Sequence, residues 1–566
     1  LHLPKGSSAI VIPEILRKVQ YIDLKQAQLS GFPEQLTVAV QNAKTALGSL
    51  SLAPIRLTNT PEEFTIKGVR DSSFLALDQF QIGSLLDVSE IGPMSGAFQF
   101  ELSLANNGGF GLSDCSGGIS QLFMNDYNYT HIEIAETSIH NEQLLSKLVV
   151  KDPHLELSSY LQLSLSAAPS YQVQLDIAHA DLHALHLSSF PGDKLQTKIN
   201  LGFEGPSWSS VVGFASFKDY IYRVDQHQIA GELAQLHYRQ AGQTTNIDLS
   251  SSVLDFSIDG LLDQSTLAED LLHHLAIIYP PIEGQKRTAV QSAANFKFNL
   301  LARNTTDLLA IFLPELQIAN GTVISGAFHS KAEDLKLQIK SPSVVYNALE
   351  MTQLNFQQSI VHDAVSGSLT VKELRVADST SFHDLQLINT GGNGVQDATL
   401  SWDPNTNDYS ELKWRTTILP NDYISFALQP SFFTINGVAW EIANQSDITL
   451  ATKEVSINDF ELHRGYQSIS INGCLSDNKR DQLRFDVIGL DLGELSDLMG
   501  LPNQYSGRFS GWGTVSTPFT NLNIAADANL EQLQIDGQSV GDIMLHSDWN
   551  DARQSIVLEG TLQYRN

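Results

Sequence analysis

Residues 506–564 read SGRFSGWGTVSTPFTNLNIAADANLEQLQIDGQSVGDIMLHSDWNDARQSIVLEGTLQY. Apolar side chains stand on every second residue of three runs: Leu522, Ile524, Ala526, Ala528 and Leu530; Ile543 and Leu545; Ile556, Leu558, Leu562 and Tyr564. Because successive side chains of a strand point to opposite faces, this spacing predicts strands with one apolar and one polar face. The Gly, Asn, Asp and Ser residues of 536–539 and 548–551 suit tight turns, so we expect antiparallel hairpins.

The same alternation recurs along the chain from Tyr21 onward, at intervals of about ten to fifteen residues. Its cleanest examples are Phe98, Phe100, Leu102 and Leu104. Short strands at such regular spacing indicate an all-β fold rather than strands separated by helices. We therefore expect one antiparallel array made of many hairpins.

Three segments, 265–279, 304–313 and 490–499, depart from this pattern and show helical spacing of their leucines. We interpret each as a short helix that plugs or caps part of the array. The alternative is a gate over a groove.

A tetrad of the form Ser-Gly-x-Phe occurs at 95–98, 325–328 and 506–509, each time after a leucine-rich segment and before alternating strands. Its recurrence indicates a duplicated unit, and the unequal spacing indicates a loose repeat rather than a tight solenoid period. On this basis we divide the chain into a first array part, a first tetrad unit, a helix-interrupted segment, a second tetrad unit and a third: 1–94, 95–264, 265–324, 325–489 and 490–566.

Composition sets further limits. The 566 residues hold 34 Lys and Arg against 63 Asp and Glu, a net charge of −29, and only 17% of them are charged. Such a chain folds, and its acidic charge repels phosphate backbones, so nucleic acid is not an expected partner. No stretch approaches the 18 apolar residues of a membrane-spanning helix, and the sequence contains no signal peptide. Because it ends at Asn566 in the middle of an expected hairpin, we expect a piece of a longer protein.

Candidate chemical sites are few. His179, His183 and His186 have the spacing of three zinc ligands on a helix, but the flanking alternation predicts a strand. Residues 403–408 resemble the start of a calcium loop without its glycine, and a hairpin turn explains them better. We find no nucleophile elbow and no phosphate-binding loop. We therefore expect neither an enzyme nor a metal or cofactor.

The carboxy-terminal stretch also resembles a known family. The resemblance rests on the order Gly507-x-x-x-Gly511, Val515, Pro518-Phe519, Leu522-x-Ile524, Leu533-x-Ile535-x-Gly537, Val540-Gly541, Leu545, Trp549 and Ile556-x-Leu558-x-Gly560. This order is similar to the repeat of the TamB family, which belongs to the AsmA-like group of bridge-like envelope proteins in diderm bacteria. It is specific over 480–566 and weaker, though sustained, elsewhere.

The resemblance implies an elongated, U-shaped β-taco whose hydrophobic groove carries phospholipid across the periplasm. It also implies an inner-membrane anchor before residue 1, further array after residue 566 and a reach toward the outer membrane. In TamB the carboxy-terminal end is associated with an Omp85-type barrel and with outer-membrane protein assembly, which implies a possible partner of that kind.

Periodicity alone leaves two ways to hide the apolar face: a second sheet packed against it, or acyl chains in a lengthwise groove. Our first hypothesis is a non-enzymatic lipid-transfer bridge. The second is an assembly factor for β-barrel proteins that acts by β-augmentation, and the third, an extended adhesin or β-helix, fits the uneven spacing poorly. For the bridge, we predict that the groove is lined by Phe98, Phe100, Leu102, Leu104, Leu335, Leu337, Ile339, Leu522, Ile524, Ile556 and Leu558.

Overall fold

The structure is a computed structural model that describes most of the chain. The residues described are 20–70, 74–105, 110–140, 142–164, 169–205, 212–262, 293–362, 364–376, 380–392, 394–419, 423–435, 437–476, 478, 480–493, 504–517, 523–550 and 555–564. Of the residues described, 78% lie in strands and 3% in helices, and the strands pair antiparallel. The predicted all-β class is therefore confirmed.

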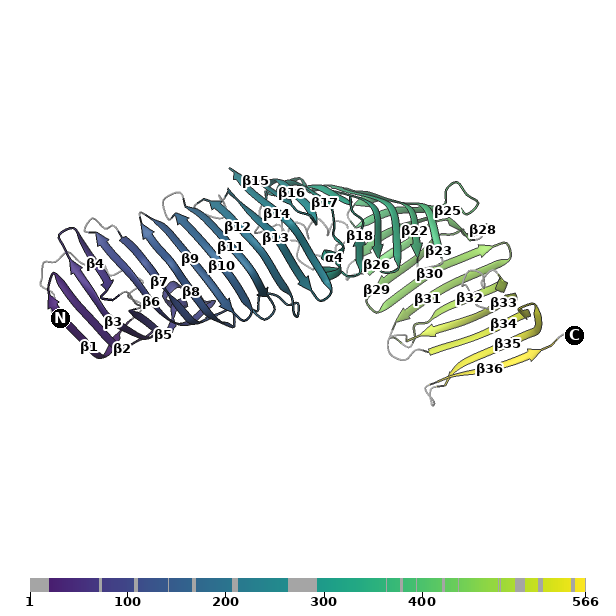
Figure 1. The fold of residues 1–566 in the computed structure, drawn as a ribbon. Coiled ribbons are helices and arrows are strands. Elements are labelled where there is room, and N and C mark those ends of the chain that lie inside the picture. The colour runs from purple at the N-terminus through teal and green to yellow at the C-terminus, as the bar shows by residue number, and fades with distance from the viewer. Residues whose placement is uncertain are drawn as a thin grey trace. The chain divides into compact units, whose positions relative to one another are not determined.

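The chain forms two compact units, residues 1–259 with 302–314 and residues 260–301 with 315–566. In each unit, strands adjacent in sequence mostly lie side by side (Figure 1). Unit 1 holds β1 (Ile22–Phe32), β2 (Gln35–Thr45), β3 (Gly48–Asn59), β4 (Glu63–Gly68), β5 (Leu75–Gln81), α2 (Ile82–Leu86), β6 (Ile91–Ala105), β7 (Phe110–Met124), β8 (Tyr127–His140), β9 (Gln143–Asp152), β10 (Leu155–Ser164), β11 (Ser170–Asp181), β12 (Lys194–Glu204), β13 (Val212–Val224), β14 (His227–Ala241), β15 (Thr244–Ser250), most of β16 (Leu254–Leu261) and α4 (Thr306–Phe312).

Unit 2 continues the same construction. It holds β17 (Asn295–Ala302) apart from its last residue, β18 (Leu316–Ile318), β19 (Val323–His329), η3 (Ser330–Ala332), β20 (Asp334–Tyr346), β21 (Leu349–Val361), β22 (Ala364–Val376), β23 (Thr380–Gly392), β24 (Val395–Trp402), β25 (Ser410–Leu419), β26 (Tyr423–Leu428), β27 (Ser431–Ile435), β28 (Val438–Ile442), β29 (Ser446–Ala451), β30 (Glu454–Arg464), β31 (Gln467–Ser476), β32 (Leu483–Asp491), β33 (Tyr505–Ser516), β34 (Asn523–Ile535), β35 (Gln538–Asn550) and β36 (Ser555–Gln563).

Hairpin turns fall largely where the sequence predicts them. Asp536 and Gly537 join β34 to β35 with φ of 52° and 75°, the paired left-handed conformation of a tight two-residue hairpin. Residues 403–408 connect β24 to β25, whose ladder closes with Trp402 opposite Ser410, so the hairpin interpretation is confirmed. The turn predicted at 548–551 is wrong in its position, because β35 and β36 stay paired as far as Asn550.

The helix predicted over 304–313 is confirmed as α4. The segment 265–279 lies outside the described residues, as do residues 494–499. The helix predicted over 490–499 does not begin at Leu490, because β32 runs to Asp491 and Leu490 still pairs with Phe509 of β33. The Ser-Gly-x-Phe tetrads lie inside β6, β19 and β33. The short helix α2 precedes the first tetrad and α4 the second.

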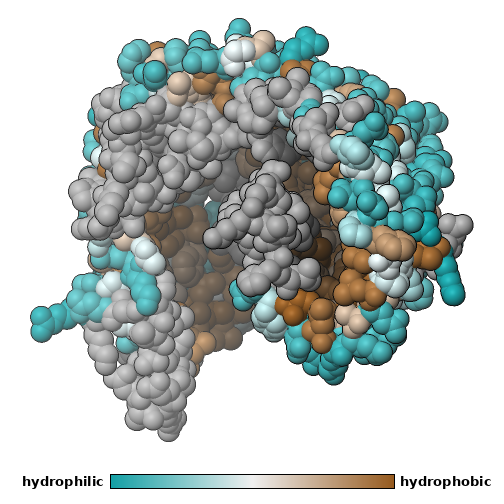
Figure 2. Space-filling view, turned by 90° about the vertical axis from the view of Figure 1, so that its left-hand side faces the viewer, coloured by the Kyte–Doolittle hydropathy of each residue, from teal (hydrophilic) through white to brown (hydrophobic). Residues whose placement is uncertain are grey.

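Many strands carry a β-bulge in their interior. The bulged residues adopt φ near +50° and include Asp114, Glu136, Asp219 and Asp459. Bulges of this kind bend a strand and increase its twist. In Figure 2 the β1 end of unit 1 faces the viewer, and a hollow lined by hydrophobic residues lies inside a largely hydrophilic outer surface.

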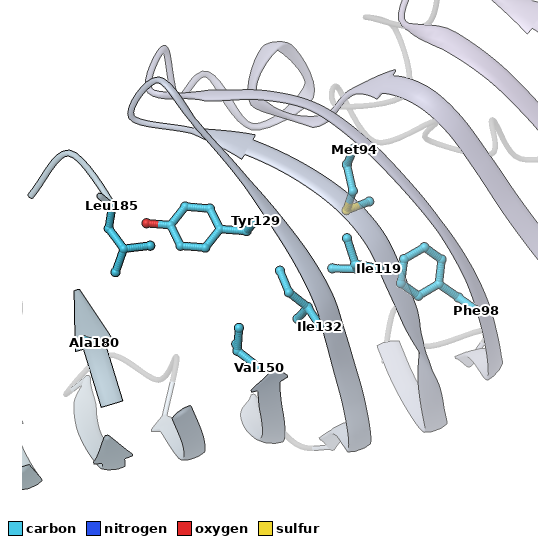
Figure 3. Close-up of a cluster of buried hydrophobic side chains, with 8 residues drawn as sticks. All are labelled: Met94, Phe98, Ile119, Tyr129, Ile132, Val150, Ala180 and Leu185. Carbon is cyan, nitrogen blue, oxygen red and sulfur yellow. The ribbon is translucent and has the colours of Figure 1, made fainter. Parts of the chain in front are cut away.

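The apolar face of unit 1 packs into a core along part of its width. Met94, Phe98, Ile119, Tyr129, Ile132, Val150, Ala180 and Leu185 point toward one another from neighbouring strands and from the segment after β11 (Figure 3). Each is at most 8% exposed. This cluster buries enough apolar surface to hold adjacent hairpins together.

Gly117 offers a matched test of this packing. A Cβ on Gly117 would lie 2.3 Å from the carbonyl oxygen of Ala97 and 2.7 Å from Cδ1 of Phe98, whereas a Cβ on Gly118 would meet nothing within 4 Å. We expect Gly117→Ala to lower the free energy of unfolding by about 1–3 kcal/mol, because the Phe98 ring must move. Gly118→Ala should change it by less than about 0.5 kcal/mol in urea unfolding. Equal effects would show that the ring is not packed on Gly117.

Candidate functional site

In unit 1, the apolar face carries an unbroken cross-strand row. Seven residues from β6 to β12 stand opposite one another in register: Leu102, Leu112, Ile139, Leu144, Leu163, Tyr171 and Phe203. Tyr171 is 36% exposed and the other six are half-buried. This row therefore forms apolar surface that the described residues cover only partly.

Unit 2 carries an equivalent row. Seven residues from β19 to β25 stand in register and are all half-buried: Ile324, Ile339, Phe356, Leu369, Leu387, Leu400 and Leu412. At about 4.8 Å between strands, the row extends for roughly 30 Å. Exposed apolar strips of this length are unusual in soluble proteins and mark surfaces that bind something.

The four groove residues predicted on β6 share one face but differ in burial. Phe98 is 8% exposed within the core cluster, and the ring of Phe100 lies 4.7 Å from that of Phe74. Leu102 is half-buried and Leu104 is 40% exposed. The apolar face of β6 thus passes from packed core at Phe98 to open surface at Leu104.

The remaining predicted groove residues belong to unit 2. Leu337 and Ile339 are half-buried on β20, while Leu335 on the same face packs against a small core made by Ile360 and Val365. Ile524 of β34 is half-buried opposite Val515. Leu522 lies outside the described residues. The last two residues are in β36, where Leu558 is 66% exposed and Ile556 pairs with Trp549.

The opposite face is polar and held by cross-strand ion pairs. Arg415 donates to Asp397 at 2.7 and 2.9 Å, which keeps the pKa of that carboxyl below its ordinary value, and Lys372 lies 2.7 Å from Asp384. Shallow hollows also occur, and one in unit 2 has a volume of about 680 Å³ and is lined mostly by Ser, Gln, Lys and Thr. This face suits contact with water.

One rim of unit 1 is closed by a network around Asp152, the last residue of β9. Its carboxylate accepts hydrogen bonds from Tyr127 Oη at 2.5 Å, Thr130 Oγ1 at 2.8 Å, Thr130 N at 2.9 Å and His154 N at 3.0 Å. Burial raises the pKa of the Asp152 carboxyl, but the hydrogen bonds outweigh it and lower the pKa below its ordinary value. Asp152 therefore ties the turns that flank β8 and β10.

A second carboxylate secures the segment after β11 on the same rim. Asp193 is fully buried and accepts hydrogen bonds from His183 N at 2.8 Å and Tyr222 Oη at 3.0 Å. Leu185, in the same segment, is also fully buried in the core cluster. The segment thus lies over part of the apolar face instead of projecting into water.

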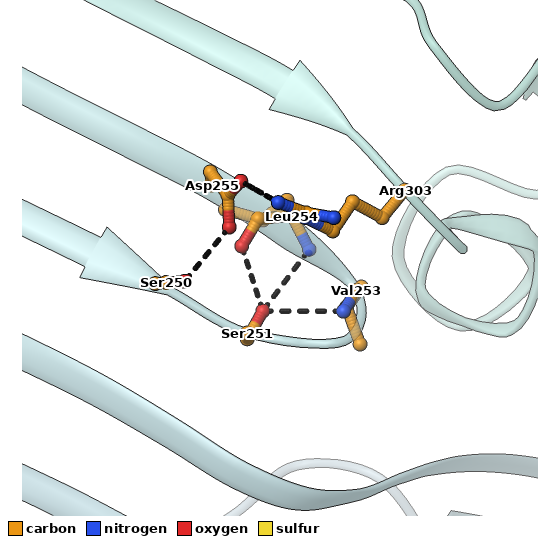
Figure 4. A network of polar contacts seen from close by, with 6 residues as sticks. All are labelled: Ser250, Ser251, Val253, Leu254, Asp255 and Arg303. Carbon is orange, nitrogen blue, oxygen red and sulfur yellow. Dashed lines mark hydrogen bonds and ion pairs between the residues drawn. The ribbon is translucent and has the colours of Figure 1, made fainter.

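Helix α4 is attached to unit 1 at both ends. Before it, Arg303 donates to Asp255 at 2.9 Å, and Ser250 donates to the other oxygen of Asp255 (Figure 4). Arg303 is the main cause that lowers the pKa of Asp255. At the far end, the Phe312 ring meets the Phe190 ring edge-on at 5.4 Å.

The three histidines with zinc-ligand spacing, for which the flanking sequence favoured a strand over a metal site, do not lie on one helix. His179 lies in β11, while His183 and His186 lie in the irregular segment that follows, with His186 at φ 59°. Within the described ranges, no group of three or more His, Cys, Asp or Glu side chains could hold a metal ion.

Among the helices that the structure describes, none is long and apolar enough to cross a membrane.

The sequence predicted the apolar faces of the strands but not the two buried carboxylates, Asp152 and Asp193, at the rim of unit 1. Asp152 and Asp193 are separated from their partners by up to 29 residues, and no spacing marks them. The bulges carry a weak signal, an Asp, Glu, Asn or Gln inside an otherwise alternating strand.

In comparisons with known proteins, no protein-family model, curated protein or solved structure matches the chain.

Proposed function

We propose that the chain is a non-enzymatic bridge that binds the acyl chains of phospholipids along its apolar face. The observation that carries this proposal is the pair of unbroken apolar rows, each seven strands wide and only half-buried. A closed core would bury such residues almost completely, because apolar surface left in water costs about 25 cal/mol per Å². Acyl chains cover it without any specific partner geometry.

The resemblance to the TamB family supports the same role and adds a location. On this proposal, the chain lies in the periplasm of a diderm bacterium, anchored to the inner membrane by a segment outside this sequence, and moves phospholipid toward the outer membrane. An Omp85-type barrel protein is the partner that the resemblance implies. The net charge of −29 is consistent with a chain that stands clear of anionic bilayer surfaces and meets lipid through its apolar face.

The proposal is tested by the lipid content of the purified chain. Native mass spectrometry after expression in a diderm bacterium should show phospholipid bound in several copies, and the chain should speed transfer of a fluorescent phospholipid between two vesicle populations. A chain that stays empty after incubation with vesicles would contradict the bridge. Recovery of an Omp85-type protein by such an empty chain would favour the assembly role.

A further inference from the structure

One cross-strand row on the apolar face of unit 2 contains two amide side chains. Gln358 of β21, Gly367 of β22 and Asn389 of β23 stand in register, between Leu337 of β20 and Ala398 of β24. Because side chains alternate along a strand, these residues point to the same side as the neighbouring apolar row at Phe356, Leu369 and Leu387. Gln358 and Asn389 are half-buried, and so remain accessible.

Hydrogen bonds fix which atoms the two amides present. Nε2 of Gln358 donates to the carbonyl oxygen of Ser366 at 3.1 Å, and Nδ2 of Asn389 donates to Oε1 of Gln396 at 3.2 Å. Each nitrogen thus donates to a residue of the next strand, and the two amide oxygens turn toward Gly367.

Gly367 provides the space into which these oxygens point. A Cβ built on Gly367 would lie 2.2 Å from Oδ1 of Asn389 and 2.4 Å from Oε1 of Gln358, so no larger residue fits without moving them. Two acceptor oxygens therefore converge over Gly367, which has no side chain. Covering such oxygens with acyl chains alone is unfavourable, because a buried acceptor needs a donor.

We propose that Gln358, Gly367 and Asn389 form a binding notch for an amphiphile headgroup that carries N–H or O–H donors. The notch rests on the proposed lipid-binding function and adds headgroup selectivity to it. It lies two residues along each strand from the row at Phe356, Leu369 and Leu387, a separation of about 7 Å. A headgroup in the notch thus leaves its acyl chains on that row.

Two lipid headgroups supply such donors, the ammonium of phosphatidylethanolamine and the glycerol hydroxyls of phosphatidylglycerol. Phosphatidylcholine is the matched comparison, since its trimethylammonium has no N–H donor. Delipidated chain is incubated with vesicles of the three lipids in equal amounts, and bound lipid is extracted and quantified by mass spectrometry. We expect a donor-bearing lipid to be enriched about fivefold over phosphatidylcholine, the effect of one net hydrogen bond. The preferred donor lipid identifies an ammonium or a hydroxyl as the donor.

Three variants locate the effect. Gln358→Leu with Asn389→Leu should abolish the enrichment and leave the total bound lipid unchanged, and Gly367→Ala should do the same by displacing the oxygens. Gln357→Leu, on the opposite face of β21, should keep the wild-type enrichment. Equal uptake of the three lipids by the wild type, or the same loss in Gln357→Leu, overturns the notch while lipid binding stands. Absence of any bound lipid overturns both the notch and the proposed function.

Discussion

Replacing Leu369 by Asp is expected to remove the phospholipid bound along the unit 2 row while the chain stays folded. Leu369 is half-buried at the middle of the unit 2 row, directly between Phe356 and Leu387. A carboxylate there stays hydrated in the free chain but loses its water under acyl chains, which costs several kcal/mol. We expect native mass spectrometry to show fewer lipids per chain than in the wild type, because the lipid on the unit 2 row is lost, with the far-ultraviolet circular dichroism unchanged.

The neighbouring residue provides the control. Ser368 precedes Leu369 on β22 and faces the other side of the sheet, so Ser368→Asp adds the same charge to the same strand and should retain wild-type lipid. If Leu369→Asp unfolds unit 2, the row is a closed protein core and not a groove. If it keeps its lipid, the acyl chains do not lie on this row.

The strands and their two faces were predictable because they depend on local spacing alone. Phe98, Phe100, Leu102 and Leu104 alternate in the sequence, and β6 places all four on one face. How deeply each of the four side chains is buried was not predictable. Phe98 is buried beside Ile119 in a cluster that also takes in Leu185 from the segment after β11 (Figure 3), whereas Leu104 lies outside that cluster and is exposed, and no local spacing marks which residues the cluster will include.

The position of polar residues within the apolar face is the other feature that spacing alone leaves open. Gln358 stands between Phe356 and Ile360 in an alternating apolar run, and Asn389 follows Leu385 and Leu387 at the same spacing. From the sequence alone, each of these two amide residues looks like ordinary variation on the apolar face. Their significance arises only from the register, which places both opposite Gly367.

Removing the Asp152 carboxylate is expected to destabilise unit 1 strongly. Asp152 is 7% exposed and accepts four hydrogen bonds, so Asp152→Ala leaves the Tyr127 hydroxyl and both Thr130 donors without their acceptor. Unsatisfied buried donors cost about 1–3 kcal/mol each, and partial access of water reduces the sum. We expect the free energy of unfolding to fall by about 3 kcal/mol, measured by urea unfolding at pH 7.

The same carboxylate gives the stability of unit 1 a defined pH dependence. Because folding lowers its pKa, the charged form is the stabilising one. Its contribution is complete above the pKa of the unfolded chain, about pH 4, and is lost as the pH falls through the lower pKa of the folded chain. Asp152→Asn should therefore flatten the fall in stability below about pH 4.

The matched control is an aspartate that makes only a surface ion pair. Asp176 is 53% exposed and lies 3.7 Å from Lys198, so Asp176→Ala and Asp176→Asn should leave both the stability at pH 7 and the acid profile close to wild type. If Asp152→Ala behaves like Asp176→Ala, the hydrogen bonds at the rim do not hold unit 1 together. Lipid binding separates the two roles further, because Asp152 lies on the rim and not on the apolar row. Asp152→Asn should keep the wild-type number of bound phospholipids at pH 7, whereas Leu369→Asp should have lost those of the unit 2 row.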